Sequence, residues 1–174
     1  MLKKKICMLG SYGVGKTSLV GRFVRSMFDD KYHTTVGVKI DKKVLSIEDQ
    51  EVTLMLWDMA GEEDGAPVKL NQVKDAAGYL LVIDGTRAKT LEVARGIQER
   101  ITNEIGPRPF LALVNKADLR ETWEIPDSTW AELAGAEWTV LETSAKSGQH
   151  VEEAFLALTS RILQAQLDDE DEDD

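Results

Sequence analysis

The sequence contains little that could form disulfides or bind metals through histidine and cysteine. Among its 174 residues there are one cysteine and two histidines. With Cys7 alone, no disulfide can form within the chain, which favours a reducing compartment, and we expect a cytoplasmic protein. Cys7 lies in an apolar run, where a buried, unreactive thiol is expected. His33 and His150 lack the spacing of metal ligands, so we assign them no chemistry.

Long hydrophobic runs and lipidation signals are also missing. No run approaches the ~18 apolar residues that a membrane-spanning helix needs. The stretch Met1–Gly10 carries positive charge, but its apolar part is too short for a signal peptide. The sequence has neither an initial Met-Gly pair for myristoylation nor a final cysteine for prenylation. We therefore expect no lipid anchor.

A basic excess is absent as well. The formal net charge is −10, and the last seven residues, Asp168–Asp174, are all acidic. This balance argues against nucleic acid as a partner. The hydrophobic fraction of 43% is typical of a globular protein. We expect one domain over residues 1–166 and a disordered acidic tail over residues 167–174, which is either simply solvated or a docking segment for a basic partner.

Short apolar runs alternate with segments of helical periodicity. Four runs are apolar almost throughout, as in parallel strands that are covered on both faces: Lys4–Gly10, Val52–Asp58, Gly78–Asp84 and Pro109–Asn115. Thr139–Thr143 is a shorter candidate strand, and Val38–Ile47 can form a hairpin with the Val52 strand. Helical spacing runs from Lys89 to the stop at Gly106-Pro107, and again over Val151–Ile162. This alternation predicts an α/β domain with a mostly parallel sheet.

Gly10–Thr17 fits the pattern G-x-x-x-x-G-K-[ST] between a predicted strand and a predicted helix. Glycines allow the backbone N–H groups to face phosphates without a Cβ in the way. Lys16 would place its ammonium between the β and γ phosphates, and the Thr17 hydroxyl would bind Mg²⁺. The placement favours a phosphate loop over a plain glycine turn, but it does not identify the base.

Further motifs follow other predicted strands. Asp58 can reach the metal, usually through water, and Gly61 can offer its N–H to the γ phosphate. Thr35 offers a second hydroxyl for Mg²⁺. In the run Asn115-Lys116-Ala117-Asp118, a carboxylate can accept from the two donors on one edge of guanine, which adenine lacks. Because each mispaired buried group costs about 1–3 kcal/mol, this carboxylate can select guanine; an ATP-binding protein is the alternative.

In their order and spacing, these motifs resemble those of the Ras superfamily of small GTPases over residues 2–166. The Rab-like branch is most similar, through Thr34–Ile40 and Leu56–Glu63, and a prokaryotic Ras-like GTPase also fits. The resemblance implies a three-layer P-loop NTPase fold, with a six-stranded mostly parallel sheet and about five helices. It also implies a GTP/GDP switch that hydrolyses GTP with Mg²⁺. Effector, exchange and activating proteins would bind its switch regions, around Thr35 and after Gly61.

The resemblance further implies a set of site residues. The nucleotide would be bound by Gly13, Val14, Gly15, Lys16, Thr17, Ser18, Phe28, Tyr32, Thr35, Gly61, Asn115, Lys116, Asp118, Ser144, Ala145 and Lys146. Mg²⁺ would be bound by Thr17, Thr35 and Asp58. Catalytic roles would fall to Lys16, Thr35, Gly61 and Glu62. Phe28 would lie against the guanine, Tyr32 would cover the phosphates, and the Ala145 N–H would face guanine O6.

Two residues depart from the family pattern. Glu62 stands where relatives carry the glutamine that positions the attacking water, and a carboxylate only accepts hydrogen bonds and is repelled by phosphate. It could impair hydrolysis, act as a base, or face solvent with little effect. Tyr12 stands where relatives carry a small residue; its ring could obstruct activation, donate to a phosphate oxygen, or turn outward.

We therefore expect slow hydrolysis without an activating partner. The alternatives are an interaction module that binds GTP with negligible hydrolysis, and a GTPase domain that works within a larger complex. Other residues carry less weight. Trp57 could be exposed to effectors or buried in the core, whereas Trp123, Trp130 and Trp138 are expected to pack. Arg87 and Arg108 are expected to be solvated loop cations.

Overall fold

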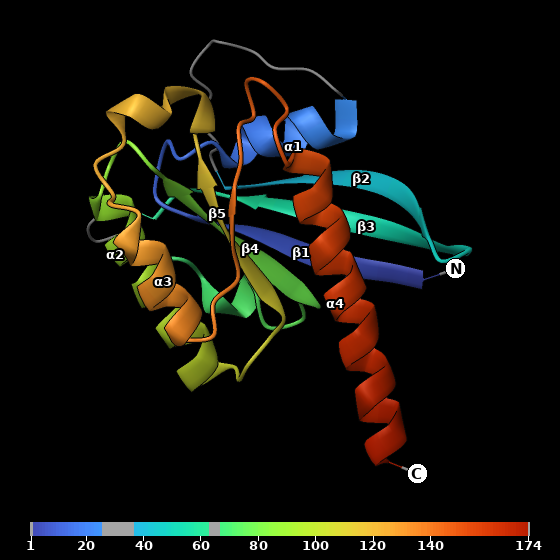
Figure 1. Cartoon of the computed structure of the whole chain (residues 1–174). Helices are drawn as coiled ribbons and strands as arrows, with labels where there is room; N and C mark the ends of the chain where they lie inside the picture. Colours follow the sequence, from blue (N-terminus) through green and yellow to red (C-terminus); the bar gives the residue numbers. More distant parts are fainter. Residues whose placement is uncertain (1, 26–36, 63–66, 174) are drawn as a thin grey trace.

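The computed structural model describes residues 2–25, 37–62 and 67–173 and forms one sheet in the strand order β2-β3-β1-β4-β5-β6 (Figure 1). The strands are β1 (Leu2–Gly10), β2 (Val38–Ile47), β3 (Gln50–Met59), β4 (Gly78–Asp84), β5 (Phe110–Asn115) and β6 (Val140–Glu142). The described residues form four α-helices, α1 (Lys16–Arg25), α2 (Lys89–Glu104), α3 (Ser128–Gly135) and α4 (Val151–Glu172), and two 3₁₀ segments, η1 (Leu70–Gln72) and η2 (Ala117–Thr122).

The sheet is parallel except at one edge. β1 pairs with β3 and β4, β4 with β5, and β5 with β6, all in parallel. β2 runs antiparallel to β3 from the pair Val38–Met59 to the pair Ile47–Gln50. The turn between them places Glu48 and Asp49 at φ values of 49° and 64°, the left-handed region that tight hairpin turns require. The predicted hairpin is confirmed.

Helices cover both faces of the sheet and complete three layers (Figure 1). On one face, α1 and α4 pack on the sheet, and Phe23 stacks on Phe155 with 4.1 Å between ring centroids. On the other face, α2 and α3 bury a second cluster that includes Trp138, with Trp57, Trp123 and Trp130 packed against it. The predicted α/β fold with a mostly parallel six-stranded sheet is confirmed. Trp57 is only partly buried, and the Lys5 ammonium lies 3.6 Å from the centroid of its ring.

The last helix is longer than its apolar stripe. α4 continues through Glu172, where a disordered tail was expected from residue 167. Side-chain hydrogen bonds one turn apart run along this end: Gln164 donates to Asp168 at 2.8 Å and Gln166 to Glu170 at 3.2 Å. Pairs at this spacing stabilise exposed helical turns. In the part of the chain that the structure describes, no helix is long and apolar enough to cross a bilayer.

Candidate functional site

The candidate site lies beside the carboxyl-terminal ends of strands β1, β3, β4 and β5. Because parallel strands end on the same side, their following loops meet there. The β1–α1 loop passes close to β5: a Cβ on Gly15 would lie 2.2 Å from the Asn115 amide nitrogen, and φ at Gly15 is 107°. Only glycine fits this position. Gly13, also in the left-handed region, and Ser18, in the first turn of α1, belong to the same segment.

Lys16, the first residue of α1 directly after this loop, is 6% exposed. Its ammonium donates to the carbonyl oxygens of Gly10 at 3.2 Å and Ser11 at 2.8 Å. Burial lowers the pKa of Lys16 to about 8; the nearby Asp58 carboxylate opposes this shift and the Arg87 guanidinium adds to it. A bound phosphate would supply the negative charge that a buried ammonium needs.

Thr17 and Asp58 form a pair of oxygen groups beside Lys16. The Thr17 hydroxyl, in the first turn of α1, donates to Asp58 Oδ2 at 2.6 Å across to the end of β3. A hydroxyl and a carboxylate at this separation can face one small cation, and oxygen ligands of this kind suit Mg²⁺. The residues present therefore fit a magnesium ion.

A second group of contacts joins the loops that follow β5 and β6. The Asn115 amide donates to the carbonyl of Val14 at 3.0 Å, and its Oδ1 accepts from the Thr143 hydroxyl and the Ala145 N–H, both at 3.3 Å. Asp118 Oδ1 accepts from the Ser144 hydroxyl at 2.8 Å. The structure thus brings Asn115, Asp118, Ser144 and Ala145 together, as the sequence predicts for a base-binding region.

The position of Glu62 is set by α2. Its backbone N–H donates to the Gly10 carbonyl at 3.0 Å, which lays this residue along the phosphate loop. Its carboxylate accepts from the Val68 N–H at 3.0 Å and pairs with Arg100 at 3.4 Å, and Arg100 also donates to the Val68 carbonyl at 3.1 Å. Of the three alternatives for Glu62, the solvent-facing one is wrong, because its carboxylate is held against α2.

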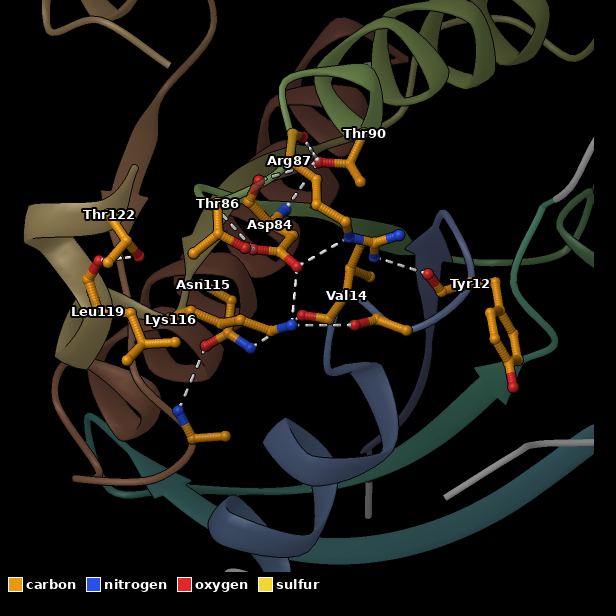
Figure 2. A network of polar contacts seen from close by, with 12 residues as sticks. Tyr12, Val14, Asp84, Thr86, Arg87, Thr90, Asn115, Lys116, Leu119 and Thr122 are labelled. Atoms are coloured by element: carbon orange, nitrogen blue, oxygen red, sulfur yellow. Dashed lines mark hydrogen bonds and ion pairs between the residues drawn. The ribbon is translucent and has the colours of Figure 1, made fainter. Parts of the chain in front are cut away.

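Gly61 fits closely against the phosphate loop, since an added Cβ would lie 2.3 Å from the Cα of Tyr12. The Tyr12 ring is partly buried and points away from the polar network behind the loop (Figure 2). Phe28, Tyr32 and Thr35, which sequence analysis assigns to the same site, lie outside the described residues.

Asp84 and Arg87 are site residues that sequence reasoning missed. Asp84 ends β4 and has no exposed surface. Its Oδ1 accepts from the N–H and the hydroxyl of Thr86 at 2.9 and 2.7 Å, and its Oδ2 accepts from Lys116 at 2.7 Å and Arg87 at 3.0 Å (Figure 2). Burial by itself would raise the pKa of Asp84, but the hydrogen bonds from Lys116, Thr86 and Arg87 outweigh it and hold the pKa below its ordinary value.

Arg87, expected to be a solvated loop cation, is instead an ion-pair partner of the buried Asp84, whereas the contacts of Arg108 are exposed to solvent, as expected. Arg87 also donates to the Tyr12 carbonyl at 2.8 Å, and Arg108 donates to the carbonyls of Pro107 and Lys74. A further arginine, Arg22 of α1, supports the loop after β6 by donating to the carbonyl of Ala145 at 2.8 Å and to that of Lys146. An acidic residue at the end of a buried strand, followed closely by an arginine, was the available signal for the Asp84–Arg87 pair.

Comparison with known proteins agrees with this arrangement. The profile of the Ras family matches residues 5–164. The Ras-related protein Rab-7a of Dictyostelium discoideum is 32% identical over 167 residues, which cover 91% of this chain and 82% of that protein. The Ras-related protein RABA1b of Arabidopsis thaliana is 34% identical over 161 residues, covering 91% and 74%. The GTP-binding protein yptV5 of Volvox carteri is 31% identical over 175 residues, covering 95% and 85%.

Proposed function

Because the chain belongs to the Ras family, whose members are small GTP-binding switch proteins with GTPase activity, we propose that it binds GTP and GDP and hydrolyses GTP slowly when no partner is present. The Rab-like relatives support a role as a molecular switch. Effector, exchange and activating proteins would bind the switch regions, as the family resemblance implies.

The buried Lys16 ammonium, with two loop carbonyls as acceptors, is the single observation that carries phosphate binding. A triphosphate in the loop would replace the hydration that burial removes from this cation. At the other end, Asp118 is oriented by Ser144, so its carboxylate can receive the two donors on the guanine edge. Asn115 ties this region to the phosphate loop through Val14, which supports simultaneous recognition of base and phosphates.

Mg²⁺ would be held by Thr17 and Asp58, together with Thr35 as the sequence suggests, and it would neutralise charge on the phosphates. Lys16 and the N–H groups of the loop would stabilise the charge that develops during in-line attack by water. Gly61 would offer its N–H to the γ phosphate.

Slow hydrolysis is supported by the contacts of Glu62. Its carboxylate is held by Arg100 and by the Val68 N–H, so it is directed toward α2. In that position it neither orients a water nor accepts a proton at the γ phosphate, and moving it there would place two negative charges side by side. The same contacts favour a second candidate function, a GTP-binding interaction module with negligible turnover.

Nucleotide affinity and single-turnover hydrolysis test the proposal. Calorimetry should give tight binding of GTP and GDP and much weaker binding of ATP; equal affinity for ATP would contradict it. Wild type should hydrolyse bound GTP slowly, and Glu62→Gln should be faster, because an amide can both accept from water and donate to phosphate. A fast wild type that Glu62→Gln slows would overturn the assignment of slow hydrolysis. GTP that persists on the purified protein for days would favour the interaction module.

A further inference from the structure

Arg87 connects a buried carboxylate with the phosphate loop (Figure 2). Its Nε lies 3.0 Å from Asp84 Oδ2, and its Nη2 donates to the Tyr12 carbonyl at 2.8 Å. Because Asp84 is fully buried and is also bonded by Thr86 and Lys116, it is a fixed anchor. A planar guanidinium with one edge on such an anchor has little freedom left, so its other donor is also fixed in space.

Two neighbouring carbonyls of the loop are held in the same way. Lys116 bonds Asp84 at 2.7 Å and approaches the Gly13 carbonyl at 3.4 Å. The Asn115 amide donates to the Val14 carbonyl at 3.0 Å. Three consecutive carbonyls, those of residues 12, 13 and 14, therefore each accept a hydrogen bond from a side chain outside the loop.

These contacts determine where the following N–H groups point. A peptide unit is planar, and when it is trans, the C=O of one residue and the N–H of the next point in opposite directions. The described residues contain no cis peptide bond. With the carbonyls of residues 12, 13 and 14 turned toward the side chains behind the loop, the N–H groups of Gly13, Val14 and Gly15 point the other way. Consecutive N–H groups that converge form an anion-binding concavity.

The three N–H groups are not equivalent. Asn115 and Lys116, which orient the third and the second N–H, lie at the end of β5 and just after it, on the side where the base is expected. The first, on Gly13, lies next to Tyr12, whose Cα is within 2.3 Å of the Cβ position of Gly61. The N–H that Arg87 orients therefore belongs to the peptide unit beside Gly61, where the terminal phosphate is expected.

We propose that Arg87 is a positioning residue for the terminal phosphate of GTP: anchored on Asp84, it fixes the Tyr12–Gly13 peptide unit so that the Gly13 N–H points at the phosphate. This inference rests on the proposed function, because it assumes a guanine nucleotide in the loop. Arg87 acts through the backbone and not by touching the phosphate. Lysine cannot replace it, since a single ammonium lacks the planar fork that reaches both Asp84 and the Tyr12 carbonyl.

Affinity for two nucleotides tests this role. In Arg87→Ala, binding of a non-hydrolysable GTP analogue should weaken about tenfold, as for the loss of one charge-assisted hydrogen bond, whereas GDP affinity should change much less. Arg108→Ala is the matched control, because Arg108 bonds the carbonyls of Pro107 and Lys74, which precede β5 and β4 and so lie at the opposite ends of these strands. This variant should change neither the affinity for the GTP analogue nor the affinity for GDP. Equal losses for both nucleotides, or no loss, would overturn the proposal.

Two further readouts separate positioning from other roles. In the GDP-bound protein, the amide resonance of Gly13 should shift in Arg87→Ala and stay in place in Arg108→Ala; weaker binding with an unmoved Gly13 resonance would indicate direct phosphate contact and overturn the positioning role. If the alanine variant fails to fold, Arg87→Lys serves as the second variant, because it keeps a cation beside Asp84. It should also bind the GTP analogue more weakly while its GDP affinity changes much less. A lysine variant with wild-type affinity for the GTP analogue would overturn the proposal. A wild type that binds no guanine nucleotide would instead refute the proposed function.

Discussion

The end of the site expected to bind the base and the end expected to hold the terminal phosphate differ in how their polar side chains are oriented. At the base end, Asn115 makes three hydrogen bonds and Asp118 is oriented by Ser144, all toward other parts of the site. At the phosphate end, the Glu62 carboxylate is bonded to α2 and to Val68. Under the function that we propose, this difference corresponds to a protein that is preorganised to hold its nucleotide and poorly prepared to hydrolyse it.

Removing the base-recognition carboxylate should have the largest effect. In Asp118→Ala, affinity for GTP and GDP should fall at least about a hundredfold, because two donors of guanine lose a buried acceptor. Affinity for ATP should stay the same. Titration with the three nucleotides measures both, and Glu121→Ala, an exposed carboxylate in the same 3₁₀ segment, is the control. An unchanged preference for guanine would show that another group selects the base.

Replacing Asp84 should affect both the expected base end and the expected phosphate end of the site, because Lys116 and Arg87 share its carboxylate. At pH 7, Asp84→Asn should lower the free energy of unfolding by about 3 kcal/mol, since it leaves two cations without their buried partner. The pKa of Asp84 is lower in the folded protein than in the unfolded chain, so its contribution is present above the unfolded value and is lost as pH falls through the folded value.

Urea unfolding of wild type and Asp84→Asn measures this at neutral and acidic pH. The difference in stability between them should shrink as the solution becomes acidic. A difference that stays constant, or that grows in acid, would show that the charge on Asp84 is not what stabilises the fold.

Removing the contact between Arg100 and the residue at position 62 should increase the effect of Glu62→Gln on hydrolysis. In an Arg100→Ala background, Glu62→Gln should raise the single-turnover hydrolysis rate at least about tenfold, and by more than in the wild-type background, because the side chain at position 62 is no longer held by α2. Affinity for GDP should not change in any of these variants. Equal effects of Glu62→Gln in both backgrounds would mean that Arg100 does not restrain this position.

The acidic end of α4 provides a distant comparison. Asp171→Gln and Glu172→Gln together remove charges that oppose the helix dipole, so the unfolding midpoint should rise by about 2 °C. Because these residues lie far from both ends of the site, GTP affinity and hydrolysis should stay unchanged. A change in either would reveal a coupling that the packing of α4 does not explain.

Much of the site was predictable because its motifs are continuous in the sequence and each follows a strand. The range of β2 matches its prediction, and the glycine-rich segment predicted to hold phosphate lies between β1 and α1, as its placement in the sequence predicts. The orientation of Glu62 was not predictable, because it depends on Arg100 in a helix that is distant in sequence. The role of Arg87 was missed although Asp84 lies only three residues before it, because its second partner, the Tyr12 carbonyl, is on the loop after β1, which only the folded sheet brings close.

Helix α4 runs from the loop beside Ala145 away from the site, and its last turns extend past the sheet (Figure 1). At 1.5 Å per residue, a helix of this length carries its far end about 30 Å from its first turn. A dye or a surface linker attached near Asp173 would therefore leave nucleotide exchange sterically unhindered. A dye at this protruding end of α4 would also report on the slower rotation of the whole domain when a large partner binds, without any probe near the phosphate loop.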